Sequence, residues 1–162
     1  MKRLMLVRHA KASWHHFSGS DYKRPLNTLG KSDAKLIGQY LYKNNYCPSY
    51  IISSHATRTL ETSKILIQKL QYNKEIETQP NIYNGNVESI LQLIYNVNDK
   101  YESIMLIGHN PMITELANHI SNVKIDYMPT CAAIIIDFNV SWKEIKNNNG
   151  VLVDFIWPKK LK

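Results

Sequence analysis

The sequence predicts an α/β fold: a three-layer sandwich with a mostly parallel central sheet and helices on both faces. Two continuously apolar runs, at residues 4–7 and 103–107, are typical of buried parallel strands. Segments of strand character alternate with segments of helical spacing through most of the chain. At 162 residues, 44% of them hydrophobic, the chain is long enough for one domain with one core. We therefore expect a single domain over residues 1–158 and a loose basic tail at 159–162.

The elements follow from hydrophobic periodicity and from helix and turn signals. Strands are predicted at residues 4–7, 50–53, 75–78, 103–107, 132–138 and 151–157. Helices are predicted at about 28–45, 55–70, 87–95 and 111–121. Asn27 or Thr28 is expected to cap the first helix, and a serine the second. Residues 14–22 read as an irregular loop, in which the neighbouring His15 and His16 face solvent or line a site.

Composition and charge argue against several classes of protein. No run of about 18 apolar residues exists and no signal peptide is evident, so we expect a cytoplasmic protein without a membrane partner. Cys47 and Cys131 stand far apart, without metal-ligand spacing, and are interpreted as structural. The net charge of +7 comes from scattered Lys and Arg residues, and no nucleic-acid motif appears. The charge favours phosphorylated or acidic partners, and we expect a monomer.

Cations and histidines stand just past three predicted strand ends. Arg8 and His9 follow the first apolar run, and His109 follows the run at 103–107. Arg58 falls in the first turn of a predicted helix, where a cation opposes the helix dipole unless an anion lies nearby; Glu61 is the simplest such partner. Parallel strands open onto one edge of a sheet, so these groups can converge. Two guanidiniums and two imidazoles around one point suit a phosphoryl dianion.

These residues belong to three motifs that together resemble the histidine phosphatase superfamily. The motifs are Arg8-His9-Ala10, the segment 54–62 with the sequence SHATRTLET, and Gly108-His109-Asn110-Pro111. The opening RHAKASW at 8–14 and the RPLN segment at 24–27 are most similar to SixA-type phosphohistidine phosphatases. Ala10 stands where the superfamily commonly has glycine, a departure shared with many SixA-like sequences.

The resemblance implies roles for four residues. His9 would be the nucleophile that takes the phosphoryl group, while Arg8, Arg58 and His109 hold its oxygens, without a metal or other cofactor. His9 must attack as a neutral imidazole, and neighbouring cations disfavour its protonation. His109 is expected to act as a charged donor to the phosphoryl group.

Further site residues are less well defined by the sequence. Lys11, Ser13 and the backbone amide of Asn110 are candidate phosphate contacts, although Lys11 and Ser13 are equally typical of a loop surface. Glu88 is the candidate general acid, or else an exposed residue in the first turn of a helix. A poor acid favours an imidazole leaving group over an alkoxide, because imidazole has a pKa near 6.5.

The predicted function is that of a phosphatase acting on a phosphohistidine-containing phosphotransfer protein. The short connection between Asn73 and Tyr101 leaves no room for a cap over the site, so its mouth is expected to admit a protein side chain. A broad-specificity small-molecule phosphomonoesterase is the alternative within enzymes. A non-catalytic phosphoprotein-binding module is the alternative of another class.

Overall fold

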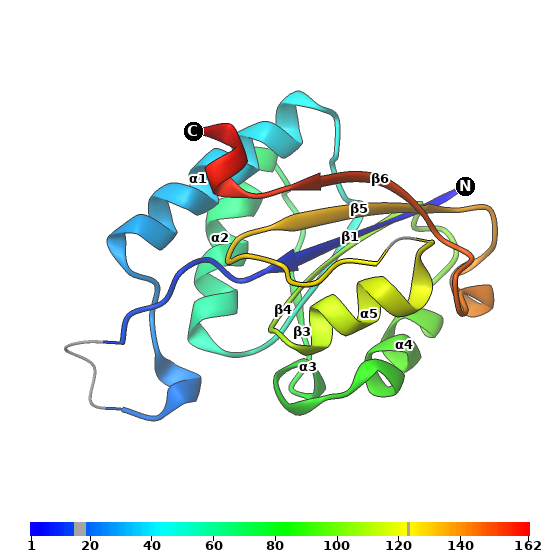
Figure 1. Ribbon diagram of the computed structural model, residues 1–162, viewed down its shortest axis with the longest axis horizontal. Coiled ribbons are helices and arrows are strands. Elements are labelled where there is room, and N and C mark those ends of the chain that lie inside the picture. Colours follow the sequence, from blue (N-terminus) through cyan, green and yellow to red (C-terminus); the bar gives the residue numbers. More distant parts are fainter. Residues whose placement is uncertain (15–18, 123) are drawn as a thin grey trace.

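A six-stranded sheet in the order β3-β2-β4-β1-β5-β6 forms the centre of the molecule (Figure 1). The computed structural model describes residues 1–14, 19–122 and 124–162, so the interpretation of His15 and His16 lies outside the described residues. The strands are β1 (Lys2–Arg8), β2 (Tyr50–Ser53), β3 (Glu77–Thr78), β4 (Ser103–Gly108), β5 (Ala133–Phe138) and β6 (Val151–Ile156). Strands β3, β2, β4 and β1 are parallel, and β5 runs antiparallel to both β1 and β6. The predicted mostly parallel sheet is confirmed.

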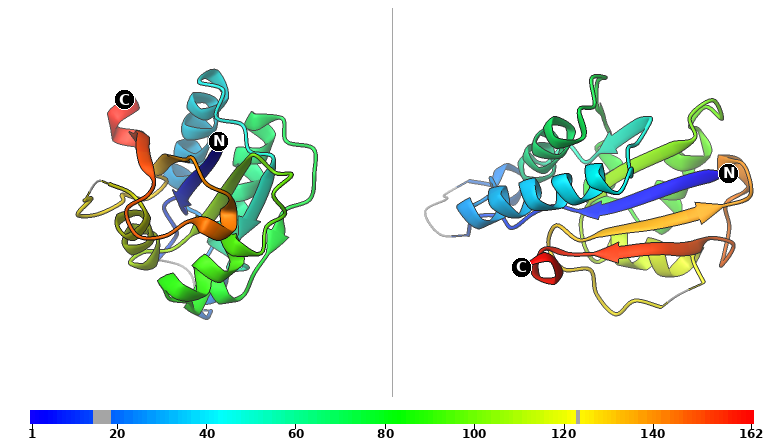
Figure 2. Two further views of the ribbon diagram at one scale, coloured as in Figure 1. Left: turned by 90° about the vertical axis from the view of Figure 1, so that its right-hand side faces the viewer. Right: turned by 90° about the horizontal axis from the view of Figure 1, so that it is seen from above.

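Helices cover both faces of this sheet (Figures 1 and 2). They are α1 (Thr28–Lys43), α2 (Thr57–Leu70), α3 (Asn81–Asn84), α4 (Val87–Tyr95) and α5 (Met112–Ile120), with 3-10 turns η1 (Asp21–Lys23), η2 (Trp142–Glu144) and η3 (Pro158–Leu161). Alternate residues of β1 face opposite layers. Met5 and Val7 pack with buried residues of α1 and α2, whereas Leu4 and Leu6 pack with those of α4 and α5. The three-layer arrangement follows from this alternation.

Two helix starts shape the loops beside the carboxyl edge of the sheet. Asn27 caps α1 as predicted, and its side chain accepts the Gly30 backbone N–H at 2.7 Å. A Cβ on Gly30 would lie 2.1 Å from the Lys11 carbonyl oxygen, so glycine lets the loop after β1 approach α1 closely. The predicted serine cap on α2 is wrong, because Ala56 holds the N-cap position. The Ser54 hydroxyl instead contacts His109, at 2.8 Å.

The sequence predicted a loose basic tail, and this prediction is wrong. Residues Pro158–Leu161 form η3 beside α1 (Figure 1). Leu161 packs against the core layer of α1 and α2, and Lys162 Nζ lies 2.8 Å from Oδ1 of the buried Asp33. A buried carboxylate and one apolar residue thus anchor a segment whose charge alone predicted solvation.

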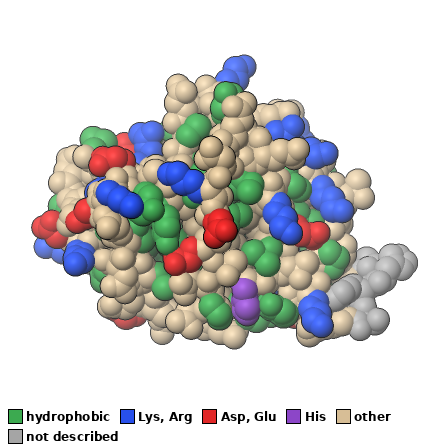
Figure 3. Space-filling model, turned by 180° about the vertical axis from the view of Figure 1, so that it is seen from behind, with side chains coloured by type: hydrophobic (Ala, Val, Ile, Leu, Met, Phe, Trp, Pro, Cys, Tyr) green, Lys and Arg blue, Asp and Glu red, His purple; other side chains and the backbone are tan. Residues whose placement is uncertain are grey.

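On the face of the molecule shown in Figure 3, charged side chains are dispersed. In Figure 3, Lys and Arg side chains spread over one whole face, with Asp and Glu side chains among them. Among the described residues, no helix has the length and apolar character needed to cross a membrane.

Candidate active site

The four residues predicted to meet do line one cavity, of about 250 Å³, at the carboxyl edge of the parallel strands. Arg8 ends β1 and His9 follows it, while His109 follows β4. Because β1 and β4 are paired with Arg8 opposite Gly108, the two histidines lie side by side, with ring centroids 5.3 Å apart. Arg58, the second residue of α2, reaches the same cavity from beyond β2.

His9 has one ring nitrogen fixed as a donor. Its Nδ1 lies 2.7 Å from the Ala10 carbonyl oxygen, which can only accept, so the proton is on Nδ1 and the lone pair is on Nε2. The Ala10 N–H donates to Thr62 Oγ1 at 3.0 Å and holds this turn in place. Burial is the main cause that lowers the pKa of His9 to about 4; the hydrogen bond to Ala10 opposes this shift, and the charges of Arg58 and Arg8 contribute to it. His9 is therefore a neutral imidazole near pH 7, as predicted.

His109 is also neutral near pH 7, which differs from the expected charged donor. Burial, followed by the neighbouring His9 and Arg58, lowers its pKa to about 3. Ser54 Oγ lies 2.8 Å from His109 Nε2 and already accepts the Ala56 N–H, so its own proton can be donated to Nε2. This arrangement places the ring proton on Nδ1, which is buried and has no hydrogen-bond partner among the described residues. His109 can thus donate as a neutral ring.

The two arginines keep part of their donor capacity free. Arg8 Nη1 donates to the Tyr127 hydroxyl at 2.6 Å and to the Met128 carbonyl at 3.0 Å. Arg58 Nη1 and Nη2 donate to the Asp21 carbonyl and carboxylate, at 2.8 and 3.0 Å. The Nε atom of each arginine is buried and, within the described part of the chain, has no partner. Buried donors without partners are uncommon, and both arginines that carry them line the cavity.

Asp21, on η1, is a site residue that the sequence analysis missed. Its carboxylate bonds Arg58, Arg24 and the Tyr83 hydroxyl, at 3.0, 2.9 and 2.7 Å. The hydrogen bond from Tyr83, followed by those from the two guanidiniums, holds the pKa of Asp21 far below its usual range. The expected pairing of Arg58 with Glu61 is wrong, because Glu61 accepts the Leu26 N–H at 2.8 Å. The loop around Asp21 has no periodicity from which its position could be predicted.

Arg24 adds a third guanidinium to the cavity. It is 9% exposed, stacks over the Trp14 ring at 3.6 Å and donates to Asp21 and to the Ser13 carbonyl. In the sequence, Arg24 belongs to one of several scattered pairs of basic residues. Only its place in the RPLN segment at 24–27 linked it to the SixA-type resemblance. Tyr83 of α3 was also missed; its ring meets His109 edge-on, with centroids 5.3 Å apart.

The other predicted contacts divide into two groups. Lys11 and Asn110 line the cavity. The Asn110 side chain is engaged with Met128 and Thr114, which is compatible with a role for its backbone only. Ser13 is not among the lining residues, and its N–H donates to the Pro25 carbonyl. Glu88 is exposed at the start of α4, accepts from Gln92 at 3.2 Å and lies outside the cavity.

Metal-ligating side chains do not gather in this region. Within the described ranges, no group of three or more His, Cys, Asp or Glu residues is placed to hold a metal ion. The cavity instead has cationic and neutral hydrogen-bond donors, with Asp21 as the carboxylate that contacts them. Such a set binds a tetrahedral oxyanion.

Comparisons with known proteins identify the family of the chain. The model of the histidine phosphatase superfamily, branch 1, matches residues 4–90. An uncharacterized chloroplastic protein of Arabidopsis thaliana is 34% identical over 155 residues, covering 88% of this chain and 70% of that protein. A structure from Agrobacterium tumefaciens assigned as the phosphohistidine phosphatase SixA is 28% identical, with a TM-score of 0.82, and the match covers 97% of this chain and 98% of that one.

A second solved structure shares the fold at lower identity. It is the protein histidine phosphatase SixA in complex with tungstate, 21% identical, with a TM-score of 0.86 over 99% of each chain. The family match begins within β1, includes His9 after that strand, and includes the start of α2 with Arg58. The chain therefore belongs to the histidine phosphatase superfamily, and its fold is that of the SixA-type members.

Proposed function

We propose that this protein is a metal-independent phosphohistidine phosphatase that acts on a phosphohistidine-containing phosphotransfer protein. The observation that carries the proposal is the state of His9. Its Nδ1 proton is held by the Ala10 carbonyl, which leaves the Nε2 lone pair available in a cavity lined by three guanidiniums and His109. Two of the similar solved structures are one assigned as the phosphohistidine phosphatase SixA and a SixA in complex with tungstate, a tetrahedral oxyanion like phosphate.

The reaction runs in two displacements at phosphorus. The substrate phosphohistidine carries a proton on its other ring nitrogen. His9 Nε2 attacks the phosphoryl group, the phosphorus–nitrogen bond to the substrate ring breaks, and that ring leaves as neutral imidazole with the proton it already had. Water then attacks phospho-His9, the second phosphorus–nitrogen bond breaks, and inorganic phosphate is released with His9 restored. Arg8, Arg58 and neutral His109 stabilise the charge on the equatorial oxygens by donating hydrogen bonds.

Among the described residues, neither of the two candidate carboxylates can act as a general acid, which supports phosphohistidine over phosphate esters. Asp21 contacts the guanidiniums, but its depressed pKa keeps it ionised and unable to donate a proton. Glu88 lies outside the cavity. An alkoxide leaving group needs a proton, whereas an imidazole with a pKa near 6.5 is often protonated in solution already. The segment between α2 and β4 holds β3, α3 and α4 without an inserted cap, which is compatible with a protein substrate.

The proposal is tested by trapping the intermediate. A histidine protein phosphorylated with phosphoramidate is mixed with the enzyme and quenched in acid or alkali within one turnover. The wild type is expected to carry an alkali-stable, acid-labile phosphoryl group, and His9→Ala none. His119→Ala is the matched control, because His119 lies on α5 outside the lining of the cavity.

Substrate preference is tested separately with steady-state rates. We expect the phosphohistidine protein to be hydrolysed with a higher kcat/KM than sugar phosphates or p-nitrophenyl phosphate. The reverse order would replace the proposal with a small-molecule phosphomonoesterase. Tight phosphate binding without turnover of any substrate would indicate a phosphoprotein-binding module. Location in the cytoplasm, a monomeric state and the lack of nucleic-acid binding stay predictions from the sequence.

A further inference from the structure

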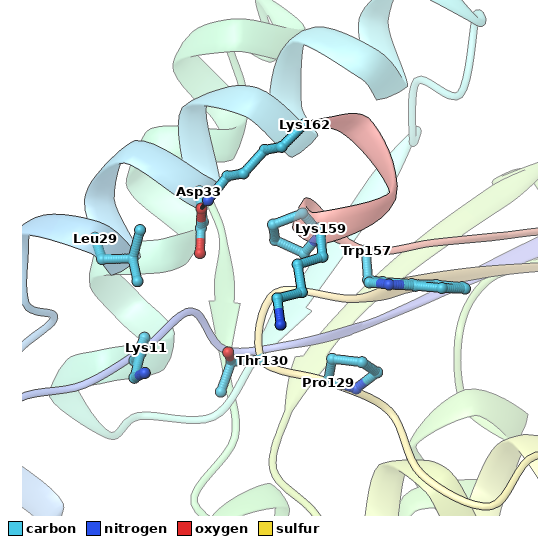
Figure 4. A pocket seen from close by; sticks show the side chains of 9 residues that line it. Lys11, Leu29, Asp33, Pro129, Thr130, Trp157, Lys159 and Lys162 are labelled. Atoms are coloured by element: carbon cyan, nitrogen blue, oxygen red, sulfur yellow. Dashed lines mark ion pairs between the residues drawn. The ribbon is translucent and has the colours of Figure 1, made fainter.

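A second cavity, of about 260 Å³, lies next to the active site (Figure 4). Lys11 and Thr130 line both cavities, so the two adjoin each other at these residues. Its other walls come from α1 and from the segment Trp157–Lys162, which η3 holds against α1. The tail that the sequence predicted to be loose therefore builds part of a surface beside the catalytic residues.

The charges in this cavity are unbalanced. Three lysines line it, and one of them, Lys162, is paired with Asp33 at 2.8 Å. The ammonium groups of Lys11 and Lys159 have no carboxylate partner among the described residues, and Figure 4 shows the Lys159 side chain reaching toward Thr130. Two uncompensated cations thus stand beside the site that takes the phosphoryl group. This electrostatic environment favours an anionic group.

Apolar side chains complete the walls. Leu29, Pro129 and Trp157 line the same cavity, and Leu29 is 46% exposed. At the neighbouring active site, Trp14 and Tyr127 are 71% and 58% exposed; Trp14 lines the cavity and Tyr127 bonds Arg8. Large apolar groups gathered at one mouth, with aromatic rings and arginines, are typical of protein interfaces. Recognition of a small phosphorylated metabolite does not require these exposed apolar side chains.

We propose that this second cavity is a docking subsite for the phosphohistidine-bearing protein, and that it binds an acidic side chain with apolar neighbours next to the phosphohistidine. The inference rests on the proposed function and specifies its substrate. The cations provide the charge complementarity, and Leu29 and Trp157 provide the apolar contact. Because Lys11 and Thr130 belong to both cavities, one segment of the partner can occupy both at once.

The test compares three synthetic peptides that differ only beside one phosphohistidine, with Glu, Gln or Lys residues at the flanking positions. For the wild type we expect kcat/KM for the Glu peptide to exceed that for the Gln peptide by roughly fivefold, the effect of one partly exposed ion pair. Lys159→Glu should reverse this preference, so that kcat/KM becomes highest for the Lys peptide. Raising the salt concentration should shrink the preference, because these charges are partly exposed.

The control variant is Lys143→Glu. This substitution makes the same change of charge as Lys159→Glu. Lys143 lies on η2, which follows β5 at the amino ends of the parallel strands, away from both cavities. It should keep the wild-type preference. Leu29→Ala should lower kcat/KM for all three peptides alike, by about threefold, a small fraction of a full leucine burial. Turnover of phosphoramidate, which is too small to occupy both cavities at once, should stay within twofold in every variant.

The outcomes separate the two proposals. An unchanged Glu preference in Lys159→Glu, with the wild type active on all peptides, overturns the docking subsite and leaves the proposed function intact. Equal loss of the preference in Lys143→Glu also overturns it, because a general effect of protein charge then explains the result. A wild type that hydrolyses none of the peptides but cleaves p-nitrophenyl phosphate overturns the proposed function and the inference with it.

Discussion

Strand β1 carries an arginine near each end, and the two are bonded in different ways. Arg3, at the amino edge of the sheet, forms a two-pronged ion pair with Asp137, at 2.7 and 2.9 Å. Arg8, at the carboxyl edge, bonds a hydroxyl and a carbonyl and has no carboxylate partner among the described residues. Its Nε is buried without a partner. The same residue type on the same strand is thus saturated at one edge and partly free at the other.

Other polar side chains at the two edges follow the same division. At the amino edge, Lys2 is 8% exposed and bonds the carbonyl oxygens of Asp99 and Tyr101. At the carboxyl edge, Arg58 and His109 each retain a buried nitrogen that the described residues do not bond. Leaving buried polar groups unsatisfied costs stability, by about 1–3 kcal/mol each. The protein therefore tolerates this cost at the edge where a ligand can supply the missing hydrogen-bond acceptors.

Single replacements of Arg8 and Arg3 should give the largest difference between the two ends of β1. We expect Arg8→Ala to lower kcat/KM by about 10²–10³-fold, the usual effect of removing a donor that stabilises transition-state charge. Arg3→Ala should leave kcat/KM within twofold and lower the free energy of unfolding by about 1 kcal/mol, since its pair is partly exposed. Phosphohistidine kinetics and urea unfolding measure the two effects. Comparable losses of activity in both variants would show that the edges do not differ in function.

The depressed histidine pKa values predict how stability depends on pH. His9 and His109 have pKa values of about 4 and 3 in the folded protein, against about 6.5 when unfolded. Between pH 6.5 and 4 the unfolded chain therefore binds protons that the folded protein does not. Their contribution to stability is complete above pH 6.5 and is lost as the pH falls, by at most about 1.4 kcal/mol per pH unit and histidine.

Urea unfolding at pH 7 and pH 5 measures this loss. The double variant His9→Asn with His109→Asn removes both titrating rings while keeping a polar side chain at each position. Its unfolding free energy should change less between the two pH values than that of the wild type. An equal change in both proteins would place the titrating groups elsewhere in the chain.

The sequence was sufficient for the features that depend on strands. The apolar runs at 4–7 and 103–107 located β1 and β4, and parallel pairing then required Arg8, His9 and His109 to meet at one edge. The motif around Arg58 placed it in the first turn of α2. Buried strands are predictable because an unbroken apolar run has few other places in a folded chain.

The remaining features depend on loops and on long-range contacts. Asp21 and Tyr83 are 62 residues apart and meet through one hydrogen bond, which no local pattern encodes. The tail at 159–162 packs on α1 because Asp33 is buried there, and helical spacing alone does not reveal a buried carboxylate. The protonation states of both histidines follow from burial, which a sequence does not give directly. The missed residues are therefore those whose roles are set by tertiary contacts.

Asp21 is a carboxylate among the partly free cations at the carboxyl edge. Its replacement tests how far it limits anion binding there. Its carboxylate occupies Arg58 and Arg24, and it repels a phosphoryl dianion bound nearby. Asp21→Asn removes this charge but keeps the backbone carbonyl that accepts from Arg58 Nη1. We expect inorganic phosphate to bind about fivefold more tightly, as a change of about 1 kcal/mol gives. Calorimetric titration measures the affinity; weaker binding would mean that Asp21 mainly orients the guanidiniums.

The smallest effect is expected at Glu88, where the sequence predicted either a general acid or an exposed helix residue. Glu88 accepts from Gln92 on the surface of α4 and does not line the cavity, so Glu88→Gln changes neither the charge nor the donors around the phosphoryl group. We expect kcat to stay within twofold for the phosphohistidine protein and for a sugar phosphate alike. The sugar phosphate is the more demanding probe, because its alkoxide leaving group gains most from a proton. A selective loss of ester hydrolysis in Glu88→Gln would show that this carboxylate reaches the site during turnover, and the argument from a missing acid to phosphohistidine would then fail.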